Sequence, residues 1–197
     1  MKILHIISSP RGSESFSRQL GAAIIEKLQA ANAGSTVLVH DLNKTPFPHL
    51  EEVHLHSFFT PVEKRSPEQA EAIRHSDQAI AEIKDADVIV IDSPMYNFGI
   101  HSGLKAWVDH IARAGQTFQY GANGPEGLIK GKKVYLAIAT GGVYSGPMAG
   151  YDFVEPYLKA LLGFLGMTDV SAFRVEGTGM PENKETALPK AIASIVL

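Results

Sequence analysis

The chain has 197 residues, 45% of them hydrophobic and 20% charged, a balance typical of one globular domain that excludes disordered and fibrous chains. Its formal net charge of -3 creates no positive field, so we expect neither nucleic acid nor a membrane as a partner. The absence of cysteine excludes disulfides and thiol redox chemistry, so a redox function would require a bound cofactor. No apolar run has the length of a signal-peptide core or a transmembrane helix, and we expect a single cytoplasmic domain over residues 1–197.

Apolar runs alternate with segments of helical periodicity along the whole chain. The expected strands are residues 2–7, 36–39, 87–92, 133–140 and 170–175. The expected helices are residues 20–31, 68–84, 104–111, 154–165 and 187–197. Ser66 and Pro67 supply a cap and a first position for the second helix. Residues 46–67 have no clean period and are predicted as an irregular excursion, whereas the turn signals in 117–132 predict a hairpin-like insertion.

This alternation predicts an α/β fold with a five-stranded parallel sheet and helices on both faces. The rhythm suits a flavodoxin-like strand order of 2-1-3-4-5. In such sheets ligands bind outside the carboxyl ends of the strands, near the point where the strand order reverses. The segments after the first, third and fourth strands are therefore the candidate binding loops.

The loop after the first strand, residues 8–17, is rich in hydroxyl side chains and leads directly into a helix. Unpaired N–H groups and the helix dipole favour a phosphate at that position. The loop lacks the GxGxxG pattern of dinucleotide sites and the GK[ST] of nucleotide triphosphatases. Taken alone, it fits a serine-rich turn with a helix cap equally well.

The segments after the third and fourth strands suggest the other end of a ligand. Met95, Tyr96 and Phe98 place large apolar side chains at the exposed end of a buried strand, beside the amide of Asn97. They either cover a planar heterocycle or seal the edge of the core. The adjacent glycines 141 and 142 allow close approach of the backbone to a ligand, although Gly-Gly alone is usually a turn. Together the three loops predict one ligand with a phosphate end and a planar ring.

The segments SSPRGSESFS, SPMYNFGI, NGPEGLIKGKK and TGGVYSGP carry a resemblance to a known family. The chain resembles the FMN-dependent NADH azoreductases, a bacterial group of flavodoxin-like quinone and azo-dye reductases, almost from end to end. The resemblance implies bound FMN, NADH as electron donor and ping-pong transfer of two electrons to quinones or azo compounds. It also implies a homodimer whose flavin pocket is shared, with Phe118 and Tyr120 as candidates for the partner's wall.

The resemblance further implies which residues bind the cofactor. No catalytic side chain is required, because the cofactor carries the hydride chemistry. We hypothesise that the N–H groups of Gly141 and Gly142 stabilise negative charge at the N1/O2 edge of the flavin, and that Tyr144 orients the acceptor. The cofactor-binding residues implied for the phosphate, the ring and the pyrimidine edge are Ser9, Ser15, Phe16, Ser17, Met95, Tyr96, Asn97, Phe98, Ala139, Thr140, Gly141 and Gly142.

Other functions have weaker support from the sequence. His49, His54 and His56 lie close together but lack the spacing of a metal site. No G-x-S-x-G motif indicates a serine hydrolase. The main alternative is a flavodoxin-type carrier of single electrons, which would use an acidic docking face that a net charge of -3 supports only weakly. A non-flavin binder on the same fold is a second alternative.

Overall fold

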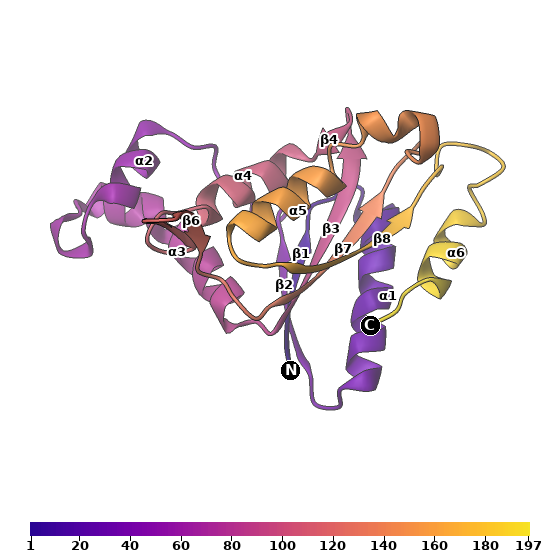
Figure 1. Cartoon of the computed structure of the whole chain (residues 1–197), viewed down its shortest axis with the longest axis horizontal. Helices are drawn as coiled ribbons and strands as arrows, with labels where there is room; N and C mark the ends of the chain where they lie inside the picture. The colour runs from indigo at the N-terminus through magenta and orange to yellow at the C-terminus, as the bar shows by residue number, and fades with distance from the viewer.

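The computed structural model describes residues 1–197 and contains a parallel sheet of five main strands. These are β1 (Lys2–Ile7), β2 (Thr36–Asp41), β3 (Val88–Tyr96), β7 (Lys133–Ala139) and β8 (Asp169–Val175), in the spatial order β2-β1-β3-β7-β8. All four strand pairings in this path are parallel, and the arrowheads of β3, β7 and β8 point to the same end of the molecule (Figure 1). The flavodoxin-like fold and its 2-1-3-4-5 order are confirmed.

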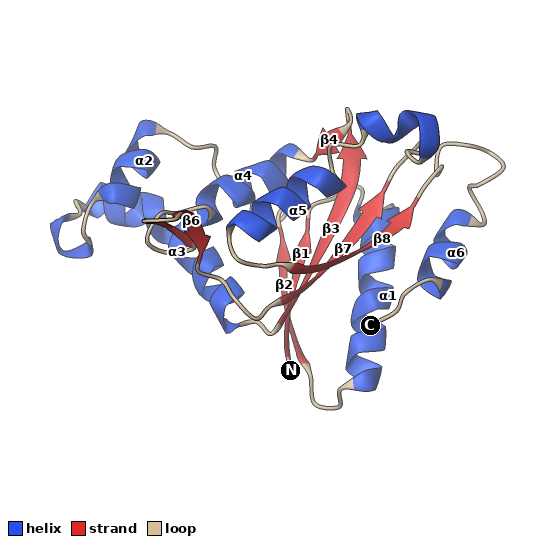
Figure 2. Ribbon diagram, viewed as in Figure 1, coloured by secondary structure: helices blue, strands red, loops and turns tan.

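Helices cover both faces of this sheet (Figure 2). One face packs against α1 (Phe16–Ala31) and α6 (Ala187–Ala193). The other packs against α3 (Pro67–Asp85), α4 (Ser102–Ile111) and α5 (Glu155–Phe164). Right-handed crossovers between parallel strands require this two-sided arrangement.

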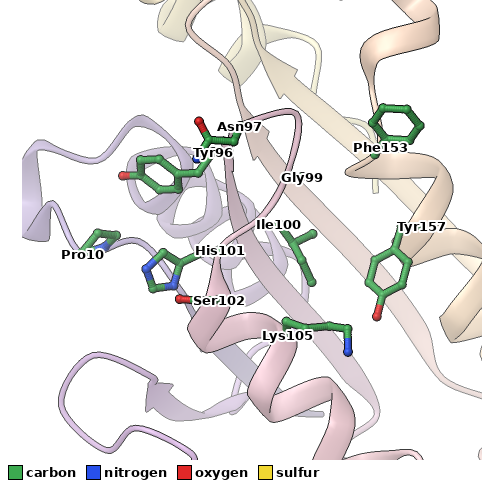
Figure 3. Close-up of a pocket in the computed structure, with 10 residues that line it drawn as sticks. All are labelled: Pro10, Tyr96, Asn97, Gly99, Ile100, His101, Ser102, Lys105, Phe153 and Tyr157. Atoms are coloured by element: carbon green, nitrogen blue, oxygen red, sulfur yellow. The ribbon is translucent and has the colours of Figure 1, made fainter. Parts of the chain in front are cut away.

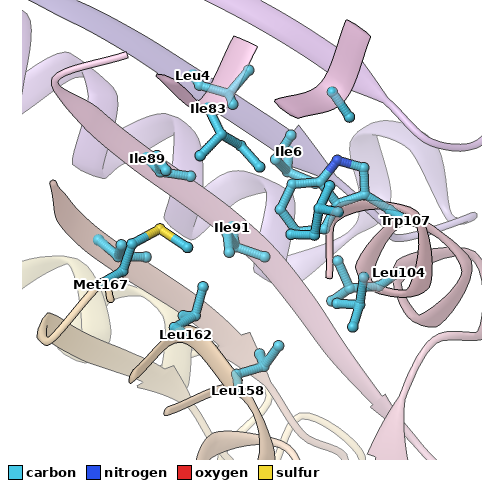
Figure 4. Packing of buried hydrophobic residues seen from close by; sticks show 14 of the residues in the cluster. Leu4, Ile6, Ile83, Ile89, Ile91, Leu104, Trp107, Leu158, Leu162 and Met167 are labelled. Carbon is cyan, nitrogen blue, oxygen red and sulfur yellow. The ribbon is translucent and has the colours of Figure 1, made fainter. Parts of the chain in front are cut away.

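The alternation of side chains along each strand divides the apolar residues between two cores. Ile89 and Ile91 of β3 belong to the core under α3, α4 and α5, where Trp107 is buried (Figure 4). Val88 and Val90, the alternate positions, belong to the core under α1 and α6. A strand buried on both faces therefore appears in the sequence as an unbroken apolar run.

The start of α3 shows why the expected helix begins where it does. The side chain of Ser66 accepts a hydrogen bond from the N–H of Gln69, and the side chain of Gln69 accepts one from the N–H of Ser66. This reciprocal capping box satisfies two donors that the helix itself leaves free. Pro67 occupies the first helical position, which needs no N–H.

The prediction of an irregular excursion over residues 46–67 is wrong. The segment contains the helix α2 (Glu52–Phe59) and a 3-10 turn (Val62–Lys64). The buried positions of α2 are His54 and Ser57, and because both are polar, the helix has no apolar period in the sequence. The ring of His54 packs edge-on against the ring of His110, with 5.1 Å between their centroids.

The insertion between α4 and β7 is a hairpin as expected, formed by β5 (Phe118–Gly121) and β6 (Gly124–Gly127). The last helix is shorter than expected and ends at Ala193, followed by a 3-10-type turn onto Ile195. No helix in the structure has the length and apolar character needed to cross a membrane.

A buried ionisable pair lies between the sheet and α1. His5 Nε2 and Asp92 Oδ2 are 2.8 Å apart, and both side chains are almost completely buried. Burial raises the pKa of Asp92 to about 6, and the hydrogen bond from His5 partly opposes that rise. Gly21 of α1 faces this carboxylate, and a Cβ at that position would overlap Asp92 Oδ1. The helix approaches the pair this closely only because residue 21 has no side chain.

We expect the Gly21→Ala substitution to lower the free energy of unfolding by about 1–3 kcal/mol, because the added methyl group overpacks the site over Asp92. The matched control is Gly163→Ala, since Gly163 is also helical but has open space where its Cβ would be. This control should be neutral or stabilising, by up to about 1 kcal/mol, because alanine favours helix. Urea unfolding of both variants measures the difference, and equal effects would contradict the close approach.

Candidate functional site

The loops after β1, β3 and β7 meet at the carboxyl edge of the sheet and enclose a cavity of about 200 Å³. A fourth segment, after β8, completes its wall. The lining residues are Ser9, Arg11, Ser15, Phe16, Pro94, Met95, Tyr96, Ala139, Thr140, Gly141 and Thr178. Eight of the residues implied by the family resemblance are therefore brought together around one cavity.

The serine-rich loop ends in a capped helix. The side chain of Ser15 accepts a hydrogen bond from the N–H of Arg18 and lies 3.0 Å from the hydroxyl of Ser17. The N–H groups of Phe16 and Ser17 have no acceptor within the protein. Free N–H groups at the positive end of the helix dipole are the donors that bind a phosphate.

The rest of this loop is held in place by short polar contacts. Ser8 donates its hydroxyl hydrogen to the carbonyl oxygen of Asp92 at 2.6 Å. Asn43, which follows β2, donates to the carbonyl oxygen of Ser9 at 2.8 Å. The loop is therefore attached to both neighbouring strands and presents its remaining donors from a fixed position.

The end of β3 turns back on itself in a two-residue hairpin. Tyr96 pairs with Gly99 of the short strand β4 (Gly99–Ile100), and Asn97 and Phe98 form the loop with φ values of 49° and 69°. Positive φ at both central positions is typical of a type I′ turn, in which asparagine and glycine are favoured. Phe98 therefore carries backbone strain of about 1–3 kcal/mol, which sites for ligands often contain.

The diglycine segment has its carbonyl groups bound and its N–H groups free. Gly141 accepts a hydrogen bond from the N–H of Gly179, and Gly142 accepts one from the N–H of Gly177. The hydroxyl of Thr140, which is buried, donates to the carbonyl oxygen of Gly142 at 2.8 Å. The N–H groups of both glycines have no acceptor in the protein. The arrangement offers two fixed donors to a bound molecule.

A second and larger cavity of about 810 Å³ is lined by the residues drawn in Figure 3. It adjoins the first cavity, because Tyr96 lines both. Asn97 lines this larger cavity rather than the smaller one. Aromatic and apolar side chains from β4 and α5 face polar groups at the start of α4. Its other lining residues are Pro10, Gly99, Ile100, His101, Ser102, Lys105, Phe153 and Tyr157.

The remaining expected site residues lie beside the cavities. Ser17 is fully buried behind Ser15. Phe98 is 43% exposed, and its ring lies 5.4 Å from that of Tyr151. Gly142 does not line the smaller cavity but adjoins Gly141, which does. Tyr144 is attached through its N–H to Glu176 Oε1 at 3.0 Å.

Several lining residues were missed by the sequence analysis. Arg11 and Pro94 lie within the candidate loops but carry no motif of their own. Thr178 comes from the segment after β8, and the parallel arrangement of that strand was the available signal. Lys105 and Tyr157 come from helices, and only the placement of α4 and α5 on the same face of the sheet brings them to the site. His49, His54 and His56 do not converge, and no group of three acidic or histidine side chains is placed to hold a metal ion.

The fold and the cavity at its strand ends define a flavodoxin-like protein with a candidate ligand site at the carboxyl edge of its sheet. The sequence profile of the flavodoxin-like fold family matches residues 1–196. An FMN-dependent NADH:quinone oxidoreductase of Herminiimonas arsenicoxydans is 50% identical over 196 residues, which cover 98% of this chain and 96% of the relative. The protein of the same description from Mesorhizobium japonicum is 47% identical over 197 residues, covering 99% and 94%. The chain belongs to the flavodoxin-like fold family and, within it, to these oxidoreductases.

Solved structures of azoreductases have the same fold as this chain. An azoreductase from Bacillus anthracis str. Sterne superposes with a TM-score of 0.91 at 29% identity, covering 98% of this chain and 95% of that one. An FMN-dependent NADH-azoreductase from Bacillus anthracis str. Ames Ancestor, crystallised in complex with FMN, gives a TM-score of 0.88 at 26% identity, with coverage of 98% and 95%.

The positive φ at Phe98 predicts that glycine is more stable than alanine at this position, which is the reverse of the usual order. At most positions alanine is more stable than glycine by about 0.5–1 kcal/mol. At Phe98 we expect Phe98→Gly to be more stable than Phe98→Ala by about 1 kcal/mol, because only glycine adopts this conformation without strain. Both variants lose the ring, so the comparison isolates the backbone.

The neighbouring exposed aromatic Phe153 is the control, because its backbone has no positive φ. Phe153→Ala should be at least as stable as Phe153→Gly in chemical denaturation. If the alanine variant were more stable than the glycine variant at both positions, the prediction of backbone strain at Phe98 would be wrong.

Proposed function

We propose that this protein is an FMN-dependent NADH:quinone oxidoreductase whose flavin lies along the carboxyl ends of β1, β3 and β7. The observation that carries the proposal is the pair of unpartnered N–H groups at Gly141 and Gly142, next to the cavity whose other wall is the serine-rich start of α1. FMN has the matching parts, a phosphate and a ring with an electron-rich edge. The proposed contacts are those of the twelve residues implied by the family resemblance.

The proposed role of each loop follows from its chemistry. The free N–H groups of Phe16 and Ser17, with the hydroxyls of Ser9 and Ser15, bind the phosphate. Arg11 adds a positive charge on the same side. Met95 and Tyr96 supply apolar surface against the ring and exclude water from one of its sides.

When bound, FMN supplies hydride acceptance and donation, which no side chain of this protein can provide. The N–H groups of Gly141 and Gly142 stabilise negative charge that develops at the pyrimidine edge of the ring. Thr140 contributes indirectly, because its hydroxyl holds the carbonyl of Gly142 and thereby fixes the direction of the turn. Both donors are in place before the reaction, so no reorganisation is needed when charge appears.

The proposed acceptors are quinones and azo compounds, reached by ping-pong turnover in which NADH leaves before the acceptor enters. The larger cavity supports this order, since it adjoins the proposed flavin site at Tyr96 and would receive NADH and the acceptor in turn. Tyr144 is proposed to orient the acceptor, because its ring lies 6.3 Å from that of Phe98 at the rim of the site.

We further propose that the chain acts as one domain in a homodimer in the cytoplasm. Two cores on the two faces of one sheet support the single domain. The support for the dimer is an apolar tip on the β5–β6 hairpin, where Tyr120 is 75% exposed and packs against Phe118. The cytoplasm is where NADH is available as a donor.

Reconstitution with FMN followed by anaerobic titration with NADH tests the proposed function. We expect the chain to bind FMN in a ratio of one to one and to lose its flavin absorbance with one equivalent of NADH, in a single two-electron step. Menadione should then restore the absorbance. A chain that cannot be reconstituted contradicts the proposal, and a stable one-electron stage during the titration would indicate an electron carrier instead.

Substitution of Gly142 tests the role of its N–H group. Gly142→Pro removes a donor that makes no bond within the protein, so we expect weaker FMN binding and at least tenfold slower reduction by NADH. Gly142→Ala is the matched control, since it keeps the N–H and its Cβ would meet only the ring of Tyr144 at 3.5 Å. Stopped-flow reduction and FMN titration compare the two. Unchanged affinity and rate in the proline variant would refute the role.

A further inference from the structure

The larger cavity has one charged residue in its wall, Lys105. This residue lies in the first turn of α4, and its ammonium group and the hydroxyl end of Tyr157 lie at the same end of the cavity (Figure 3). No acidic side chain lines the cavity. Burial lowers the pKa of His101, the other residue with a basic nitrogen in the wall, which favours its neutral form.

Away from Lys105, the wall of the cavity is apolar and aromatic. Tyr96 and Phe153 are 38% and 58% exposed, and Ile100 lies between the two sides (Figure 3). Exposed aromatic surface in a cavity of about 810 Å³ is typical of a site that receives a flat apolar molecule. The chemistry of the wall therefore combines ring stacking at one end with a single positive charge at the other.

Lys105 already has a partner outside the cavity. Its Nζ lies 2.5 Å from Asp109 Oδ1, one turn further along α4, and the lysine side chain is 50% exposed. An exposed pair of this kind contributes little to stability, about 0–1 kcal/mol. The ammonium retains two further N–H donors, so it can bind a ligand without leaving Asp109. The N-terminus of α4 next to it favours negative charge on that ligand as well.

We propose that Lys105 is a specificity-determining residue that binds an anionic oxygen group on the aromatic substrate of the larger cavity. The inference rests on the proposed function, because it concerns the molecule that stacks next to the flavin. Two sources supply the same chemistry: a sulfonate or carboxylate on the acceptor, or the pyrophosphate of NADH. Both enter the same cavity in ping-pong turnover.

The test compares substrates that share a ring and differ in charge. Holoenzyme carrying Lys105→Gln is assayed with 1,4-naphthoquinone and with its 2-sulfonate, each at saturating NADH, and then with NADH varied. We expect KM for the sulfonate to rise about fivefold to tenfold with KM for the neutral quinone unchanged. A rise confined to KM for NADH supports the proposal with the pyrophosphate as the anion. Lys105→Arg should restore the affinity in either case.

The control is Lys130→Gln, because Lys130 also pairs with a carboxylate four residues away, at 2.5 Å, and lies on the surface outside the cavity. A second readout avoids turnover: isothermal titration with naphthalene-2-sulfonate, which the enzyme cannot reduce, should show the same loss of affinity in Lys105→Gln. Changes no larger than those of Lys130→Gln with every anion would overturn the proposal. If the Lys105 proposal fails in this way but the variant reduces the neutral quinone at the wild-type rate, the proposed function still stands. Failure of the proposed function would instead appear as failure of the wild-type chain to bind FMN, before any variant is compared.

Discussion

The register of β3 against its two neighbours is the constraint on which the site depends. Asp92 pairs with Ile7 at the end of β1, and Pro94 pairs with Ala139 at the end of β7. The loops that follow these strands must therefore leave the sheet at one edge. Because β3 continues two residues past its last partner in β7, Tyr96 extends beyond the edge of the sheet and lines both cavities. A shift of one residue in this register would exchange the two faces of β3 and move Tyr96 away from the cavities.

The backbone N–H groups at the site are free to bind a ligand, because they have no acceptor within the protein. The carbonyls of Gly141 and Gly142 accept hydrogen bonds from the segment after β8, whereas their N–H groups have no acceptor in the protein. The first N–H groups of α1 are free because a helix cannot satisfy them. The turn with positive φ at Phe98 places its aromatic ring outside the core. The site is thus prepared by the backbone, which suits a reaction whose chemistry belongs to the cofactor.

The fold was predictable because its signals are local. Buried parallel strands are apolar runs, α3 has a capping box and a proline, and the hairpin at β5 and β6 is marked by glycines. The helix α2 was not predictable in this way, since it buries His54 and Ser57 against other polar and aromatic groups. Periodicity detects apolar contacts, and a helix that packs through imidazole and hydroxyl groups leaves no such pattern.

The sequence alone determined the flavodoxin-like sheet and the three loops at its carboxyl edge, whose residue types predict a site for a phosphate and a flat ring. Each of these depends on neighbouring residues and on the rule that ligands bind at the carboxyl ends of parallel strands. Only the tertiary structure decided which N–H groups remain free, that Phe98 has a positive φ, and that Lys105 and Tyr157 share a cavity. These features depend on segments far apart in the chain, such as Gly142 with Gly177 and Lys105 with Tyr157, and no spacing within one segment encodes them.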